Sequence, residues 1–240
     1  MQAIILAAGL SKRLRPLTDS TPKCLLKVGN KTILEMTFDN ILKAGINDFV
    51  MVTGYRENMI KDFIAHKYPD LNIKYLTNSD YENNNNSYSL WMAKENITGE
   101  CILLDSDILF DYRIIEKILN SPHDTCLAVN TNHKLGEEEI KVIVDSTNKI
   151  LHIGKTLIPE KSYGESIGIE RFSYDFFKKL GKVLDRKIIA EKNVNEFYEA
   201  SFQELIDIGN VFFAVDVSEY KSMEIDTPED LTRAKSEFLG

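Results

Sequence analysis

The first half of the chain alternates apolar segments with amphipathic ones, and this alternation restricts the fold more than any other feature of the sequence. Residues 2–8 form a continuous apolar run, which is typical of a strand buried on both faces. Further strands are predicted at 48–53, 72–76 and 101–104, and helices at 32–44, 56–67 and 87–94. Strands that alternate with helices imply right-handed crossovers and a mainly parallel sheet. We therefore predict an α/β fold.

The second half of the chain has a different pattern. Strands are predicted at 140–144, 149–153, 166–172 and 211–215, the first two as a hairpin. Helices are predicted at 174–184, near 195–208 and from Thr227 onward, where Thr227 is the N-cap and Pro228 the first helical residue. No repeat or linker separates the halves. We expect one domain over residues 1–240, whose sheet becomes mixed and whose second half adds a small lobe.

Three loops of the first half should meet at one edge of the sheet. They follow the strands at 2–8, 72–76 and 101–104, and the last of them begins with Asp105-Ser106-Asp107. In open α/β sheets, ligands bind beyond the carboxyl ends of the strands. The sequence therefore predicts a ligand site at this edge.

Charge is unevenly distributed along the chain. It has 29 Lys and Arg against 37 Asp and Glu, a net charge of −8. Residues 12–31 contain six basic residues and one acid, so they carry +5 and the rest of the chain carries −13. A short cationic segment on an acidic protein favours a small anionic ligand such as a nucleotide, whereas nucleic acid would need a broad basic face.

Several classes of protein are disfavoured. The longest apolar run, 3–10, falls far short of the ~20 residues that span a bilayer, and it has no flanks typical of a secretory signal. The three cysteines form no CxxC pair, so neither a disulfide framework nor a zinc site is expected. We therefore expect a cytoplasmic protein that neither enters membranes nor binds nucleic acid.

A long motif follows the first strand. The residues after Leu6 read AAGLSKRLRPLTDSTPK, and the small Ala7, Ala8 and Gly9 let the backbone approach a base or phosphate closely. The motif matches neither a Walker loop nor a dinucleotide fingerprint. LAAGLSKRLRPLT followed by PK resembles the signature of nucleotidyltransferases that activate phosphorylated metabolites on a GT-A-like, Rossmann-type fold.

This resemblance implies an activity and several roles. Members of the family condense a nucleoside triphosphate with a phosphate monoester and release pyrophosphate. The resemblance implies that Leu6, Ala7, Ala8 and Gly9 wrap the nucleotide, and that Arg13 and Lys23 are the catalytic cations on its phosphates. Residues 1–130 would then be the nucleotide-binding half, and 131–240 the acceptor-binding half.

Carboxylates are expected to hold a metal. Mg²⁺ prefers oxygen ligands, and Asp105-Ser106-Asp107 resembles a DxD metal motif at a strand end. The family places a second metal-binding aspartate in a late segment that is similar to MEIDTP at 223–228. The resemblance therefore implies that Asp107 and Asp226 bind Mg²⁺, with Asp105 as a supporting neighbour.

One segment points to the nucleotide. Residues 85–90, NNSYSL, are similar to the NNxYSL pattern of bacterial phosphocholine cytidylyltransferases. This similarity implies that the donor is CTP and that Asn86 and Ser87 approach its base.

The acceptor side departs from the phosphocholine enzymes and looks more like related cytidylyltransferases of phosphonates. Lys155 is predicted to hold the acceptor phosphate and Glu165 a hydroxyl or ammonium group. Tyr198 is predicted to contribute to an aromatic cage for a quaternary amine. The other predicted members of that cage are Trp91, Tyr163 and Phe197, with charge from Glu196 and Glu199.

The leading hypothesis is a Mg²⁺-dependent enzyme that transfers CMP from CTP to phosphocholine, phosphoethanolamine or 2-aminoethylphosphonate, alone or as a homodimer. Two alternatives stay open. One is a sugar-1-phosphate nucleotidyltransferase that uses UTP or dTTP, and the other is a non-catalytic nucleotide sensor.

Overall fold

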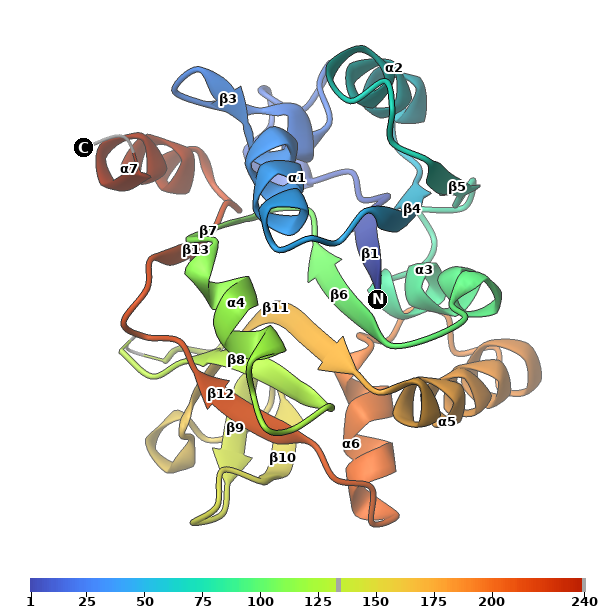
Figure 1. The fold of residues 1–240 in the computed structure, drawn as a ribbon, viewed down its shortest axis with the longest axis vertical. Coiled ribbons are helices and arrows are strands. Elements are labelled where there is room, and N and C mark those ends of the chain that lie inside the picture. Colours follow the sequence, from blue (N-terminus) through green and yellow to red (C-terminus); the bar gives the residue numbers. More distant parts are fainter. Residues whose placement is uncertain (133–134, 239–240) are drawn as a thin grey trace.

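A computed structural model describes residues 1–132 and 135–238 of the chain. Within these ranges, strands from both halves of the sequence join one nine-stranded mixed sheet (Figure 1). Its main path runs β10-β9-β11-β6-β1-β4-β5; β8 branches from β11, and β12 pairs with β8.

The first half supplies the parallel part of the sheet. Its strands are β1 (Gln2–Ala7), β4 (Asp48–Thr53), β5 (Ile73–Thr77) and β6 (Cys101–Asp105). The central β1 pairs in parallel with β4 and β6, and β4 pairs in parallel with β5. All six residues of β1 are buried, as its apolar sequence predicts.

The second half makes the sheet mixed. Its strands in this sheet are β8 (Cys126–Asn130), β9 (Lys141–Val144), β10 (Ile150–Gly154), β11 (Gly164–Phe172) and β12 (Phe213–Asp216). The long β11 runs antiparallel to β6, β8 and β9, whereas β12 is parallel to β8. The predicted α/β class with a mixed sheet is confirmed.

Helices cover both faces of the sheet (Figure 1). One apolar core contains residues of α1 (Ile33–Lys43), α2 (Glu57–Lys67) and α4 (Arg113–Leu119). The core on the opposite face contains residues of α3 (Asn86–Ala93), α5 (Tyr174–Asp185) and α6 (Glu199–Asp207). Thr32 accepts a hydrogen bond from the Glu35 amide at 3.0 Å, so the predicted cap of the first helix is confirmed.

A third, smaller core joins the two ends of the chain. The strand β7 (Ile108–Phe110) pairs with β13 (Ser222–Glu224), and α7 (Pro228–Phe238) follows. Leu14 and Leu26 from the early motif pack in this core with Ile225 and Leu231. The basic segment and the late acidic segment are therefore held against each other by apolar packing.

Several short elements escape the sequence prediction, and α6 begins four residues later than expected. The elements not predicted are the two-residue strands β2 (Lys27–Val28) and β3 (Lys31–Thr32), then β7, α4, β8, β13 and a π-helical turn at Arg186–Ala190. The β7–β13 pair has only three residues per strand and joins segments more than a hundred positions apart. Periodicity within a local window does not reveal such a pairing.

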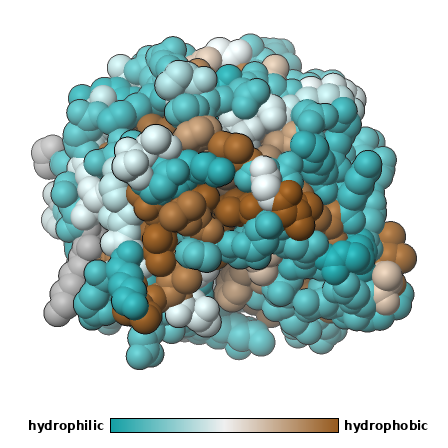
Figure 2. All heavy atoms as spheres, turned by 90° about the horizontal axis from the view of Figure 1, so that it is seen from below, coloured by the Kyte–Doolittle hydropathy of each residue, from teal (hydrophilic) through white to brown (hydrophobic). Residues whose placement is uncertain are grey.

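Figure 2 shows apolar side chains gathered on the face that lies at the bottom of Figure 1. The exposed apolar residues Leu151, Ile208 and Val211 belong to β10 and to the turn between α6 and β12. None of the helices in the described ranges has the length and apolarity that crossing a bilayer requires. The homodimer stays a prediction.

Candidate functional site

A cavity of about 540 Å³ opens at the carboxyl ends of β1 and β6. Gly9, Asn78 and Asp107, from the three loops predicted to meet at this edge, all line it. The cavity also carries most of the predicted site residues, namely Leu6, Ala7, Ala8, Arg13, Lys23, Asn86, Lys155, Glu165 and Asp226. The position of the site at the sheet edge is therefore as the sequence predicts, whereas the roles of these residues remain predictions.

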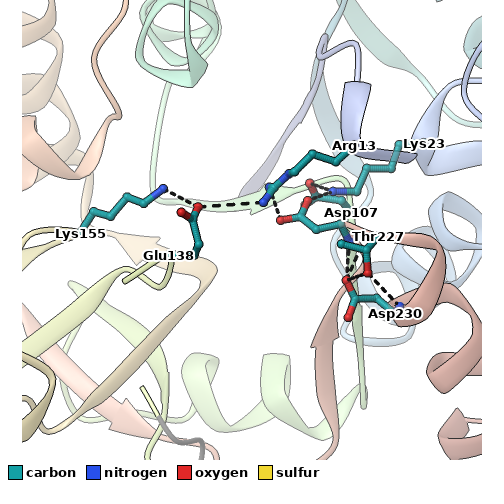
Figure 3. Close-up of polar contacts among 8 residues, drawn as sticks. Arg13, Lys23, Asp107, Glu138, Lys155, Thr227 and Asp230 are labelled. Carbon is teal, nitrogen blue, oxygen red and sulfur yellow. Dashed lines mark hydrogen bonds and ion pairs between the residues drawn. The ribbon is translucent and has the colours of Figure 1, made fainter. Parts of the chain in front are cut away.

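Lys23 is the centre of an ion-pair cluster (Figure 3). Its Nζ lies 2.7 Å from Oδ2 of Asp107 and 2.6 Å from Oδ1 of Asp226. The Lys23 side chain is only 7% exposed, so both pairs are largely shielded from water. Arg13 donates a further hydrogen bond to the second carboxylate oxygen of Asp226. The predicted phosphate-binding cations thus hold the predicted metal-binding carboxylates.

The charges in this cluster shift the pKa values of Lys23 and Asp226. Burial opposes the charged form of Lys23, but Asp107, Asp226 and Glu224 more than offset it and raise the pKa of Lys23. Burial likewise opposes ionisation of Asp226, yet Lys23 and Arg13 hold the pKa of that carboxyl below its usual value. Lys23 is therefore a permanent cation and Asp226 a carboxylate at neutral pH.

Glu224 is a member of this cluster that sequence reasoning missed. One carboxylate oxygen from each of Asp107, Glu224 and Asp226 lies within 4.8 Å of the others. Dehydration in the cleft and the charges of Asp107 and Asp226 raise the pKa of Glu224 to about 9, although part of its side chain is exposed. Three convergent carboxylates fit a hard divalent cation such as Mg²⁺.

The alternation of residues around β13 was the signal that could have found Glu224. Met223 and Ile225 are buried in the small third core, so the residues between and after them face the opposite way, into the cavity. Those residues are Glu224 and Asp226. A period of two therefore places both carboxylates at the site.

Thr227 rather than Asp226 caps the last helix, as predicted. Its Oγ1 accepts from the Asp230 amide at 3.2 Å, and Asp230 accepts from the Thr227 amide at 2.9 Å (Figure 3). This reciprocal capping box leaves the side chain of Asp226 to the cavity.

Glu138 links the two sides of the cavity (Figure 3). Its Oε2 lies 2.8 Å from Nζ of Lys155 and 4.0 Å from Nη1 of Arg13. The sequence offered no signal for this role beyond the run of acids at 137–139. The carboxylate of Glu138 is thus ion-paired with both Lys155, which is predicted to bind the acceptor phosphate, and Arg13, which is predicted to bind the nucleotide.

Two predicted site residues lie beneath the cavity rather than on its wall. Ser87 is fully buried behind Asn86. Tyr198 is also fully buried, where its hydroxyl lies 2.9 Å from Oδ2 of Asp105 and its amide donates to Oδ1 of Asn86. Both are placed to support the wall and not to touch a ligand in this cavity.

The predicted aromatic cage is not assembled. Of its four rings, Phe197 lines the cavity, 5.7 Å from the Nζ of Lys155. Trp91 instead packs on the core and donates to Asp185 at 2.9 Å, and Tyr163 packs against the same core. Of the four predicted rings, therefore, Phe197 alone lines the cavity.

Gly168 permits the close packing behind Asp105. It has φ +71°, and a Cβ there would lie 3.0 Å from Oδ2 of Asp105 and 2.8 Å from Cδ1 of Ile108. The register of β11 against β8 shifts between Ser166 and Glu170, which brackets this glycine. The bulge brings β11 against the strand end that carries the DxD motif.

Known proteins resemble this chain over the same features. A nucleotidyl transferase family model matches residues 2–131. The CTP:phosphoglutamine cytidylyltransferase of Campylobacter jejuni is 30% identical over 252 residues, covering 96% of this chain and 98% of that protein. The choline-phosphate cytidylyltransferase of Streptococcus pneumoniae is 37% identical over 110 residues, 46% of each protein.

A solved structure shares the fold of this chain. The solved structure of CTP:phosphocholine cytidylyltransferase from Streptococcus pneumoniae matches this one with a TM-score of 0.81 at 23% identity, over 100% of this chain and 99% of that one. The family signature, the mixed sheet and the cavity at its edge agree with these matches. The chain therefore belongs to the nucleotidyl transferase family of enzymes, within which it is similar to cytidylyltransferases.

Proposed function

We propose that this enzyme transfers CMP from CTP to a small acceptor that carries a phosphate or phosphonate, and that it requires Mg²⁺. The observation that carries the proposal is the shielded bridge from Lys23 to Asp107 and Asp226 inside the cavity. A triphosphate is bound by cations, and the Mg²⁺ ion that accompanies it is bound by carboxylates, so the two kinds of side chain are needed side by side.

The chemistry explains the residue types. An oxygen of the acceptor phosphate bonds to the α-phosphorus of CTP while the bond from that phosphorus to the bridging oxygen breaks, and pyrophosphate leaves with that oxygen. Negative charge develops on the phosphate oxygens, so fixed cations lower the barrier. A phosphate monoester has a second pKa of about 6, so the acceptor is already ionised and needs no general base.

Asp107, Glu224 and Asp226 are the residues that would hold the metal ion, which when bound neutralises phosphate oxygens. Lys23 and Arg13 would then exchange carboxylate partners for phosphate oxygens. Burial opposes the charged form of Lys23 and its anionic neighbours favour it. A phosphate oxygen is also anionic, so the exchange leaves Lys23 with a negative partner that keeps it charged.

The opposite wall of the cavity suits the acceptor. Lys155 lies there beside Phe197, and Glu165 lines the same region. The relatives named above act on phosphoglutamine and on choline phosphate, both of which join a phosphate to a nitrogen-bearing group. We propose that Lys155 binds the acceptor phosphate.

Release of pyrophosphate from CTP, UTP, dTTP, ATP and GTP, with a panel of phosphate, phosphonate and sugar 1-phosphate acceptors, tests the proposal. We expect turnover with CTP, dependent on Mg²⁺. Preference for UTP or dTTP with a sugar 1-phosphate would replace the proposal with the sugar-nucleotide activity.

A further inference from the structure

A group of buried oxygens beneath the cavity lacks hydrogen-bond partners. Among the described residues, five side chains carry such oxygens, namely Ser87, Ser166, Glu170, Glu199 and Ser201. Both carboxylate oxygens of Glu170 are in this state. Buried polar atoms are nearly always paired in native proteins, so a cluster of unpaired ones calls for a missing partner.

Two of these residues reach the cavity. Ser166, on β11, is 8% exposed, and Glu199, in the first turn of α6, is 5% exposed, and both line the cavity wall. Glu170 is fully buried and does not line the cavity; it lies in β11, which pairs at this residue with Leu103 of β6 and Leu127 of β8. Ser166 and Glu199 therefore lie on the cavity wall, with Glu170 and Asp105 close to them.

The electrostatics of this region favour a cation. Burial, then the charges of Asp105 and Glu199, raise the pKa of Glu170 well above its usual value, and Ser166 is close enough to oppose this shift without making a hydrogen bond of ordinary geometry. Lys23 belongs to the metal cluster, and Lys155 lies at the cavity wall beside Phe197. The unpaired oxygens of Glu170 and Glu199 belong to acidic groups, and they have no basic partner among the described residues. A hydrogen-bond donor with positive charge would supply both the missing bonds and the missing counter-charge.

Hydrogen bonding restricts that group further. Carboxylate oxygens accept hydrogen bonds, so they need N–H donors, and a primary ammonium supplies three. A trimethylammonium group has none and would leave every one of these oxygens unpaired. Such a group is bound instead by several aromatic faces, and the aromatic side chains among the described residues of the cavity wall are Tyr81 and Phe197.

We propose that Glu199 and Ser166, with the carboxyl of Glu170 buried close to them, form a pocket for an ammonium group that retains N–H bonds, on an acceptor whose phosphate lies at Lys155. This inference rests on the proposed function and narrows its acceptor. It selects amino-alkyl phosphates and phosphonates and disfavours phosphocholine.

The test compares 2-aminoethyl phosphate with phosphocholine, its N-trimethyl counterpart, and with 2-hydroxyethyl phosphate, which lacks the charge. We expect kcat/KM to be higher for 2-aminoethyl phosphate by at least about tenfold, since each charge-assisted hydrogen bond lost to a buried carboxylate has an effect of that order. Glu199→Gln and Glu170→Gln should remove this preference mainly through KM. Glu160→Gln, which makes the same change at an exposed position outside the cavity, should keep it.

The outcomes separate the pocket from the activity. Equal or better use of phosphocholine, or an unchanged preference in both glutamine variants, would overturn the pocket while leaving the transferase activity in place. If no acceptor supports pyrophosphate release from CTP, the proposed function fails, and calorimetric binding of the same two amines still decides the pocket. Thermal unfolding verifies that each variant is folded, because a glutamine at either position keeps the shape of the glutamate.

Discussion

Lys23 Nζ donates to Oδ1 of Asp226 at 2.6 Å, although 203 positions separate the two residues. Asp107 accepts from the same nitrogen, so one lysine holds two carboxylates that would otherwise repel each other. The pairing offsets the charge of both carboxylates inside the cavity. On the proposed function, phosphate oxygens and a metal ion would take the place of these partners.

Replacing this lysine should affect both activity and stability. We expect Lys23→Met to lower kcat by about 10²–10³, the usual effect of removing one stabilising group from a transition state. It leaves Asp107 without its ion-pair partner and Asp226 with Arg13 alone, so the variant should melt at a lower temperature and gain more from added Mg²⁺ than the native enzyme. Lys27→Met changes an exposed member of the same basic segment and should do neither. If Lys23→Met had the same kcat as the native enzyme, Lys23 would have no role in catalysis.

The metal requirement should depend on particular carboxylates. Asp107→Asn, Glu224→Gln and Asp226→Asn each remove one oxygen ligand charge, so we expect each to raise the Mg²⁺ concentration that gives half-maximal pyrophosphate release. Outer contacts of metal ligands typically change affinity 10–100-fold, and direct ligands should change it at least that much. Glu229→Gln, on the nearby helix but outside the cavity wall, serves as the control. Full activity after removal of divalent ions would contradict the metal site.

Glu138 should compete with anionic ligands. It holds Lys155 and approaches Arg13, so Glu138→Gln is expected to lower KM for the acceptor by a few-fold at most, because such exposed pairs contribute only about 0–1 kcal/mol. Glu137→Gln alters the adjacent exposed acid and should leave KM unchanged. A rise in KM in the Glu138 variant would mean that this carboxylate helps to bind substrate.

The stability of the protein should depend on pH through Glu199. Burial raises the pKa of this carboxyl from 4.5 to about 7, so the folded state holds the proton more tightly than the unfolded state does. The stabilisation is complete below about pH 4.5 and is lost as the pH rises through 7. Glu199→Gln cannot ionise, so its free energy of unfolding should increase relative to the native protein over this range, by up to about 3 kcal/mol.

Denaturant unfolding at several pH values measures this difference. The groups that face Glu199 include Asp105, Glu170, Tyr198 and Glu224, all retained in the variant. Glu160→Gln should show no such trend because Glu160 is exposed. A constant difference between the native and Glu199→Gln proteins would show that Glu199 does not titrate in this range.

Gly168 should be intolerant of a side chain. Gly168→Ala places a methyl group against Asp105 and Ile108 in a backbone conformation that disfavours it, and we expect a loss of about 1–3 kcal/mol. Gly209→Ala is the matched control, since Gly209 has φ +90° but open space around it. The difference between the two variants in chemical denaturation isolates the crowding behind the DxD strand, and equal losses would attribute the effect to backbone conformation alone.

Elements with a strong local pattern were predictable. The six buried residues of β1 and the cap at Thr32 follow from apolar continuity and from a short-range hydrogen bond. The β7–β13 pair was not predictable, because three residues per strand carry too little periodicity. The late start of α6 at Glu199 has a comparable origin, since residues 195–198, NEFY, include none that excludes either a helix or a loop.

Some features of the candidate site could likewise be predicted from the sequence, and others could not. The strand–helix alternation and the edge at which the loops meet could be predicted from the sequence, because they depend on neighbours within a few positions. The phosphate and metal roles came from the family resemblance and stay predictions. The three-dimensional fold was needed to find that Lys23 bridges Asp107 and Asp226, that Glu224 and Glu138 join the site, and that Glu170 is buried near it. Trp91 and Tyr163, which were predicted to form the aromatic cage, instead pack against the apolar core. Contacts across a hundred or more residues follow from how the cores close, and no local window of sequence contains that information.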